Sequence, residues 1–146
     1  MQERYLGDIH DYFKFLFLKY LSSYLKTKIG LNWYLVNPNN IGKKEIEKND
    51  GEKRNFLKIK SFTKLDPKII KELKYLKAKK NRKISCFTKN SHLKYHINFY
   101  NEYLELDNRE NWFRKSVEIL KNEKIIFLDP DNGFKSNFKG SKSLKY

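Results

Sequence analysis

The spacing of apolar residues near the start of the chain predicts a long helix between residues 8 and 26. Apolar side chains recur there every three or four positions, which places them on one face of a helix. Asp8 stands before this pattern, and Asp is a preferred N-cap residue. Further apolar residues widen the face, so we expect most of this helix to be buried. The expected buried side chains are Ile9, Phe13, Leu16, Tyr20 and Tyr24, flanked by Phe17, Leu18, Leu21 and Leu25.

Apolar runs without polar alternation predict buried strands. Residues 28–36 (KIGLNWYLV) end at a cluster of Asn and Pro, and residues 124–128 (KIIFL) end at an Asp-Pro pair. Residues 97–100 form a shorter candidate strand, and residues 54–59 a short extended segment. Runs of this kind are typical of parallel sheets that helices cover on both faces.

Two amphipathic segments complete the expected architecture. Asp66 and Pro67 predict the start of a helix that extends to about residue 80. Residues 109–121 predict another helix. Helices thus alternate with strands, which indicates an α/β fold with a Rossmann-like layered sheet of mainly parallel strands. The side chains expected to face inward are Ile69, Ile70, Leu73 and Leu76 in the first of these helices, and Trp112, Phe113, Val117 and Leu120 in the second.

The chain has 146 residues, which fits one domain. We assign residues 1–134 to a single α/β domain and residues 135–146 to a basic, mobile tail, because the last twelve residues are polar and carry four basic and no acidic side chains.

The net charge of +15 is concentrated in the middle of the chain. Residues 58–95 carry 13 basic and 2 acidic side chains, whereas residues 96–134 are acidic on balance. One explanation is a surface that binds a polyanion such as DNA or RNA. The other is codon bias, because 27 of the 32 basic residues are Lys and Ala occurs once. The residues expected to bind nucleic acid are Lys68, Lys71, Lys74, Lys79, Arg54 and Lys142.

Residues 129–133 (DPDNG) are the strongest candidate for chemistry. They follow a predicted strand directly, and ligands of open α/β sheets bind at the carboxyl ends of the strands. Asp129 and Asp131 can accept protons from a substrate, and Asn132 completes the polar site at the strand end. Asp129 and Asp131 can also bind a divalent metal such as Mg²⁺ or Mn²⁺ through oxygen. The alternative is an ordinary turn, because Asp, Pro, Asn and Gly are also the commonest turn residues.

A second pair of carboxylates, Asp8 and Asp11, stands at the start of the first predicted helix. Helix capping and the helix dipole explain both residues without any ligand. Capping does not stop the same residues from lining a pocket, so we include both in the candidate catalytic set with Asp129, Asp131 and Asn132. These residues form one site only if the two segments meet in the fold.

Several classes of protein are excluded or disfavoured. A single Cys excludes an internal disulfide framework, and the spacing of His92 and His96 is a weak zinc signal. The sequence contains no P-loop, no GxGxxG and no GxSxG motif. No apolar run approaches the about 18 residues of a membrane span, and we find no secretory signal pattern. We therefore expect a cytoplasmic protein that does not enter membranes.

Six short motifs are spread in order over nearly the whole chain: Tyr5–Asp11 with Lys14, Ile29–Leu35, Asn49–Gly51 with Arg54, Arg109 with Trp112, Phe127–Gly133, and Gly140–Lys142. In these motifs the chain resembles an uncharacterised family of bacterial and phage proteins. The resemblance implies a Rossmann-type, methyltransferase-like fold. It also makes S-adenosylmethionine a candidate cofactor beside Mg²⁺ or Mn²⁺.

Two features depart from that pattern. Amino-methyltransferases receive their target amine at a DPPY-type motif, and here Asp131 replaces the second Pro while no glycine-rich loop follows the first strand. Members of the family continue beyond the Gly140–Lys142 motif, whereas this chain ends at Tyr146. The resemblance therefore implies a C-terminally shortened form with an incomplete sheet. An open sheet edge of this kind favours a homodimer.

These features predict an enzyme-like α/β domain that acts on nucleic acid or nucleotides, of phage or mobile-element origin. Two reactions stay open: methyl transfer and metal-dependent phosphodiester cleavage. Two alternatives also stay open. One is a non-catalytic nucleic-acid-binding or interaction protein, and the other is a truncated family member without activity.

Overall fold

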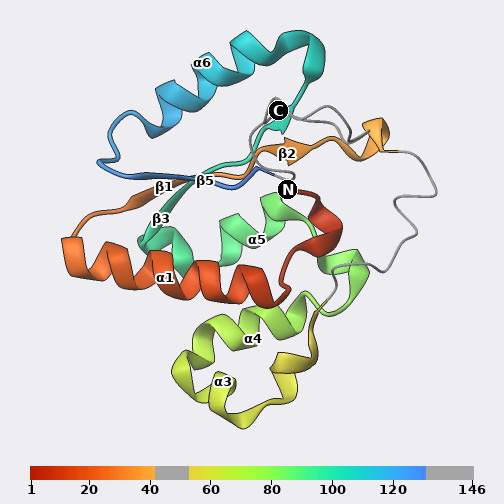
Figure 1. Ribbon diagram of the computed structural model, residues 1–146, viewed down its shortest axis with the longest axis vertical. Helices are drawn as coiled ribbons and strands as arrows, with labels where there is room; N and C mark the ends of the chain where they lie inside the picture. The colour runs from red at the N-terminus through yellow and green to blue at the C-terminus, as the bar shows by residue number, and fades with distance from the viewer. Residues whose placement is uncertain (42–52, 131–146) are drawn as a thin grey trace, which may run out of the picture.

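The computed structural model describes residues 1–41 and 53–130 of the chain. Within these residues, the centre of the fold is a three-stranded parallel sheet in the order β3-β1-β5 (Figure 1). The strands are β1 (Ile29–Asn32), β3 (Ile97–Tyr100) and β5 (Ile126–Leu128). The predicted α/β class with a mainly parallel sheet is therefore confirmed.

The predicted strand at residues 28–36 is in fact two short strands. The chain changes direction after β1, where Tyr34 adopts a left-handed backbone conformation with a φ of 48°. The backbone N–H of Tyr34 donates to the side-chain oxygen of Asn32 at 3.1 Å, which holds this turn. After the turn, β2 (Leu35–Val36) pairs in parallel with β4 (Tyr103–Leu104), and these two strands form a second small sheet.

Helices cover both faces of the central sheet. α1 (Ile9–Leu25), α4 (Pro67–Tyr75) and α5 (Ile84–Asn90) lie on one side, and α6 (Arg109–Leu120) lies on the other (Figure 1). α3 (Lys60–Leu65) packs beside α4. Short 3₁₀ turns join these elements at Glu3–Tyr5, Pro38–Asn40, Asn55–Lys58, Lys79–Asn81, His92–Tyr95 and Leu106–Asn108.

The order of the strands reverses beside β1. The chain leaves β1 through α3, α4 and α5 and enters β3 on one side of it. It then crosses the opposite face of the sheet as α6 and enters β5 on the other side of β1 (Figure 1). Such a reversal is a topological switch point, and the crevice at the carboxyl ends of its strands is where open α/β sheets bind ligands.

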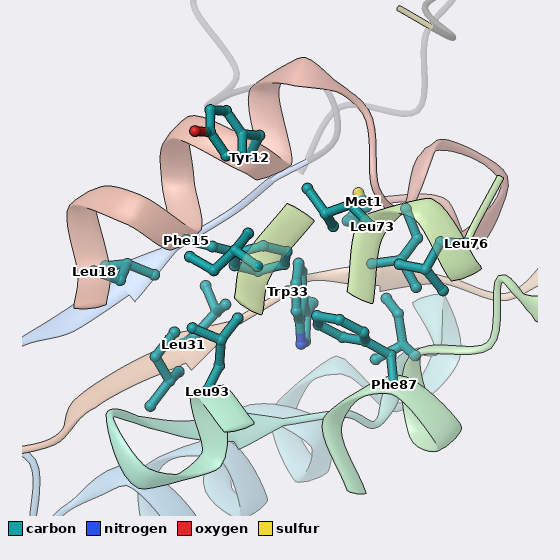
Figure 2. Packing of buried hydrophobic residues seen from close by; sticks show 14 of the residues in the cluster. Met1, Tyr12, Phe15, Leu18, Leu31, Trp33, Leu73, Leu76, Phe87 and Leu93 are labelled. Carbon is teal, nitrogen blue, oxygen red and sulfur yellow. The ribbon is translucent and has the colours of Figure 1, made fainter. Parts of the chain in front are cut away.

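The larger core lies between the sheet and the three helices on its α1 side, and Trp33 lies at its centre (Figure 2). The indole ring is fully buried. It meets the ring of Phe15 edge-on at 5.9 Å and stacks on Phe99 at 6.0 Å. Phe15 in turn stacks on Phe87 of α5 at 5.3 Å. These aromatic contacts tie α1 and α5 to the carboxyl end of β1.

A smaller core on the other face depends on Gly30. Ile29 and Leu31 point into the larger core, so Gly30 between them faces α6. A Cβ atom at this position would lie 3.2 Å from Cγ1 of Ile126 and 3.4 Å from Cδ2 of Leu120. The missing side chain lets α6 pack closely on the sheet. The buried members of this core are Tyr100, Leu104, Trp112 and Leu120.

The extent of the first helix is confirmed, but the face expected to be buried is wrong. Phe13, Tyr20 and Tyr24 are exposed, by 72% at Tyr24, whereas Tyr12 and Phe15 are fully buried. This helix carries apolar residues on every side, so its periodicity does not select one face. The face that turns inward is the one that can meet the sheet and the α4 helix.

Other differences arise at the edges of the fold. Ile126 and Leu128 of β5 are 44% and 40% exposed rather than buried, because β5 is an edge strand among the described residues. Phe113 and Val117 of α6 are exposed for the same reason, since no further strand lies beneath them in the described part. Residues 54–59 contain a 3₁₀ turn instead of an extended segment.

Several predictions fall outside the described residues. Asp131, Asn132 and Lys142 lie there, as does the predicted tail at residues 135–146. In the described ranges, no helix combines the length and the apolar character that a membrane crossing requires.

We predict that Gly30→Val destabilises the fold by about 1–3 kcal/mol, because the new side chain overpacks the contact with Ile126 and Leu120. Ile126→Ala removes one of the side chains that the new valine would overlap. The double variant should therefore lose less free energy of unfolding than the two single variants together. Urea denaturation of all four proteins measures the coupling, and strict additivity would contradict the proposed close packing.

Candidate functional site

The candidate site lies at the carboxyl ends of β1 and β5, beside the reversal of strand order. Asp129 is the first residue after β5. Its backbone N–H donates to the carbonyl of Asn32, the last residue of β1, at 2.9 Å. The pairing of the two strands therefore fixes the backbone position from which the Asp129 side chain extends. The sequence prediction that this residue stands at a strand end is confirmed.

Lys14 joins Asp129 to the start of the first helix. Its Nζ lies 2.7 Å from Oδ2 of Asp129 and 2.8 Å from Oδ1 of Asp11. The lysine side chain is only 10% exposed, and its ammonium lies 5.0 Å from the centre of the Trp33 ring. A buried ammonium is held between two carboxylates and above an aromatic face, which are the partners that offset the loss of its hydration.

Asp11 and Asp8 are held by the backbone of the helix start. The second oxygen of Asp11, Oδ2, accepts the N–H of Gly7 at 2.6 Å. Asp8 caps the helix, and its Oδ1 accepts the N–H groups of His10 and Asp11 at 2.9 and 3.0 Å. Gly7 has a φ of 86°, a conformation that favours glycine, and it aims its N–H at the Asp11 carboxylate. Capping and site geometry are thus achieved by the same residues.

These groups surround a hollow of about 240 Å³. This volume is smaller than the roughly 300–1,000 Å³ of a site for a complete small molecule, so it suits a single reacting group of a larger substrate. The structure brings together Asp8, Asp11 and Asp129 of the predicted catalytic set, while Asp131 and Asn132 lie outside the described residues. The full lining is Met1, Tyr5, Asp8, His10, Asp11, Lys14, Asp129 and Pro130.

Burial controls the protonation of this cluster. Burial raises the pKa of the Asp129 carboxyl group, and the neighbouring Lys14 ammonium opposes that rise. Burial also raises the pKa of Asp8, against the backbone N–H of Asp11 that stabilises its charged form. For Lys14, burial alone would lower the pKa, but the charges of Asp11 and Asp129 outweigh it and raise the pKa above 10.5. Lys14 is therefore a fixed cation at neutral pH.

The cluster has the chemistry of a proton acceptor. A carboxylate whose pKa is raised is a stronger base than one in water and can take a proton from a hydroxyl or amine group of a substrate. Asp129 and Asp8 both meet this description and both line the hollow. Lys14 places a positive charge beside them that can stabilise developing negative charge.

The fit to a metal ion is partial. In the described part of the chain, no three His, Cys, Asp or Glu side chains gather as a metal site. The Lys14 ammonium already lies between Asp11 and Asp129, where a cation shared by both carboxylates would bind. The predicted metal pair of Asp129 and Asp131 includes a residue outside the described ranges.

The fit to S-adenosylmethionine is poor. In the fold that the resemblance implies, the cofactor binds a glycine-rich loop after the first strand. Here the residues at that position are Asn32 and Trp33, both buried, and the indole belongs to the core. Trp33 therefore occupies space that such a loop would leave open.

The predicted nucleic-acid-binding residues separate into two groups. Lys68, Lys71 and Lys74 are exposed on α4, and Lys79 is exposed in the following turn rather than on the same helix. Arg54 instead has a structural role, because its guanidinium donates to the carbonyls of Arg4 and Tyr5 at 3.4 Å.

His92 and His96 do not share a helix face. His92 begins a 3₁₀ turn, and its Nδ1 lies 2.7 Å from Oε1 of Glu72. His96 ends that turn and faces Ser22 at 3.4 Å. The two residues stand at opposite ends of one 3₁₀ turn, so their spacing does not bring them together as it would on an α-helix.

Lys14 is a site residue that the sequence did not predict, although it belongs to the first of the six motifs that carry the family resemblance. Its signal was a lysine inside an apolar helix three residues after Asp11, where a solvated charge has no obvious place. No protein-family model, curated protein sequence or solved structure matches the chain. The fold and the site together define an α/β protein with a buried carboxylate–lysine cluster at the carboxyl edge of its sheet.

We predict that Lys14→Met lowers the free energy of unfolding by about 3–5 kcal/mol, because it leaves the buried Asp11 and the half-buried Asp129 without their cation. The control is Lys121→Met, which breaks an exposed pair with Glu118 and should cost less than about 1 kcal/mol. Urea denaturation at neutral pH measures both. Equal losses in the two variants would show that the Lys14 cluster contributes nothing to stability.

The same cluster should give a defined pH dependence. Because the folded-state pKa of Lys14 lies above its ordinary value of 10.5, its contribution is complete below that pH and is lost as the pH rises through the folded-state pKa. The stability difference between wild type and Lys14→Met should therefore stay constant from neutral pH and shrink above pH 10.5. Unfolding curves across that range test this, and a difference that already declines near neutral pH would contradict it.

Proposed function

We propose that the protein is an enzyme that acts on nucleic acid or nucleotides, and that Asp8, Asp11, Lys14 and Asp129 form its active site. One observation carries this proposal: carboxylates from the first helix and from the end of β5 line one hollow at the carboxyl edge of the sheet. Ligand sites of open α/β sheets occur at this place in the fold.

In this proposal, Asp129 accepts a proton or a hydrogen bond from the reacting group of the substrate. Burial raises its pKa and so strengthens it as a base. Lys14 holds the carboxylate in one orientation through the 2.7 Å contact. Asp8 lies at the same hollow and supplies a second carboxylate with a raised pKa.

The charge of the surface supports a nucleic-acid or nucleotide substrate. The exposed lysines of α4, Lys68, Lys71 and Lys74, belong to the most basic part of the sequence. The opposite face of α4 is apolar and buried, so these three lysines all face solvent. Neutralisation of phosphates by such residues releases counterions and makes binding strongly dependent on salt.

Two reactions are candidates for this site, and they place different demands on it. Phosphodiester cleavage would use Mg²⁺ or Mn²⁺, held by Asp129 with Asp131, to polarise a phosphoryl oxygen. Methyl transfer to an amine would use Asp129 as the acceptor of the amine hydrogen, as the sequence resemblance implies. The buried Trp33 at the end of β1 disfavours the second reaction in the structure described here.

A second candidate function is nucleic-acid binding without catalysis. The observation that favours it is that Asp11 uses one oxygen for Gly7 and the other for Lys14. A cluster whose charges are already paired can serve stability alone. Binding would then depend on the lysines and fall steeply as the salt concentration rises.

The decisive experiment compares wild type with Asp129→Asn, which keeps the shape and removes the charge. Each protein is incubated with labelled single- and double-stranded DNA and RNA, with Mg²⁺, Mn²⁺ or S-adenosylmethionine, and assayed for cleavage and methyl transfer. We expect Asp129→Asn to lose at least about 100-fold in turnover, in the range for removal of a general base. Its nucleic-acid binding should be unchanged or slightly tighter.

The matched control is Asp107→Asn, an exposed carboxylate that does not line the Asp129 hollow, which should keep full turnover. Calorimetry with the two metal ions and S-adenosylmethionine separates the reactions. Absence of both turnover and heat would refute the enzyme, and salt-dependent nucleic-acid binding in that case would support the second function.

A further inference from the structure

We propose that a second hollow, between α4 and α5, binds a nucleoside monophosphate, either free or at the phosphorylated end of a nucleic-acid strand. This hollow has a volume of about 670 Å³, within the roughly 300–1,000 Å³ of small-molecule sites. It shares no lining residue with the Asp129 hollow, so it is a separate site. Its lining comes from α4, from the turn after it, from α5 and from the start of the next turn.

The charge of this hollow favours an anion. Lys68, Lys71, Lys80 and Lys83 all line it, and Glu72 is its one acidic residue among the described ones. Lys83 has a carboxylate partner, because its Nζ lies 3.6 Å from Oε2 of Glu3. For the other three lysines, the described residues offer no carboxylate within ion-pair distance. A phosphate group would relieve the repulsion between these ammonium groups.

Glu72 lowers the net positive charge of the lining by one, but four lysines outweigh it and its two oxygens are engaged elsewhere. Oε2 accepts the hydroxyl of Ser91 at 2.5 Å. Oε1 accepts the backbone N–H of His92 at 2.9 Å and faces its ring Nδ1 at 2.7 Å. The carboxylate thus binds the turn after α5 to α4 and forms a fixed wall of the hollow.

The rest of the lining suits a flat, partly apolar body. Leu76 and Phe87 are buried side chains at the hollow, and Phe87 is fixed by its stacking on Phe15. Tyr75 is 67% exposed and offers an aromatic face on which a base can stack. Asn90 donates its amide N–H to the carbonyl of Cys86, which leaves its amide oxygen to accept from a base amine.

A nucleoside monophosphate is the ligand that uses both parts of this lining. Inorganic phosphate would meet the lysines and leave the exposed ring of Tyr75 uncovered. A nucleoside would cover that ring and leave the lysines unneutralised. The combination of a phosphate with a base satisfies both, so each part alone should bind more weakly than the whole.

The single cysteine of the chain provides a direct probe, because Cys86 is exposed and lines this hollow. Its rate of alkylation by a fluorogenic maleimide is measured with AMP or UMP, and separately with adenosine or inorganic phosphate. We expect saturating AMP or UMP to slow alkylation at least fivefold, and the two fragments to slow it less than twofold at the same concentration. Equal rates with and without both nucleotides would overturn the proposal.

Two double variants with the same change in net charge separate binding of AMP in the hollow from general attraction of AMP to a basic surface. Lys68→Glu with Lys71→Glu removes two lining lysines, and Lys60→Glu with Lys64→Glu is the control, with two exposed lysines of α3 that do not line the hollow. By calorimetry, we expect the Kd for AMP to rise at least tenfold in the first variant and less than threefold in the control. Equal losses in both would overturn the site.

The aromatic contribution is tested with Tyr75→Ala against Tyr24→Ala, an exposed tyrosine on α1. A rise in Kd of at least threefold in Tyr75→Ala alone supports stacking, and equal values would count against a base in the hollow. A 5′-phosphorylated oligonucleotide that binds tighter than AMP identifies a strand end as the natural source, and weaker binding identifies the free nucleotide. Asp129→Asn should bind AMP as wild type does, which separates this proposal from the enzymatic one.

Discussion

The contact of one ammonium with two carboxylates joins the first helix to the carboxyl end of β5. Lys14 binds Asp11 within its own helix and Asp129 at a separation of 115 residues. The buried ring of Trp33 lies beside this contact, with its centre 5.0 Å from the ammonium. Charges in such surroundings are costly unless they are paired. The orientation of the first helix, the position of β5 and the shape of the hollow therefore depend on the same three charges.

The small sheet explains both where the site lies and what stays exposed. Three parallel strands give one reversal of order, and Asp129 stands beside it. The same small size leaves β5 at an edge of the described sheet, so that its outer side chains and part of α6 meet solvent. The acidic and basic side chains are also separated in the fold. The carboxylates gather at the sheet edge, and the exposed lysines gather on the helical layer formed by α4 and its neighbours.

Much of the fold and part of the site could be predicted from local signals. Asp8 caps its helix as expected, and the apolar runs around Leu31 and Phe127 are strands. The buried face of α1 could not be predicted, because apolar side chains surround that helix and its orientation is set by long-range contacts such as the one between Lys14 and Asp129. Arg54 shows the same limit: its charge suggested a phosphate partner, but in the folded chain its guanidinium donates to the carbonyls of Arg4 and Tyr5.

The parallel pairing of β5 with β1 has a consequence for how the molecule folds. The two strands lie far apart in the sequence, and closing so long a loop costs entropy before any contact returns it. The carboxylate–lysine cluster can form only when β5 has paired with β1, whereas α1 can form early from local contacts. Completion of the cluster is therefore a late event in folding. A fluorescence change of Trp33, whose ring lies 5.0 Å from the Lys14 ammonium, would report in real time the moment at which β5 docks.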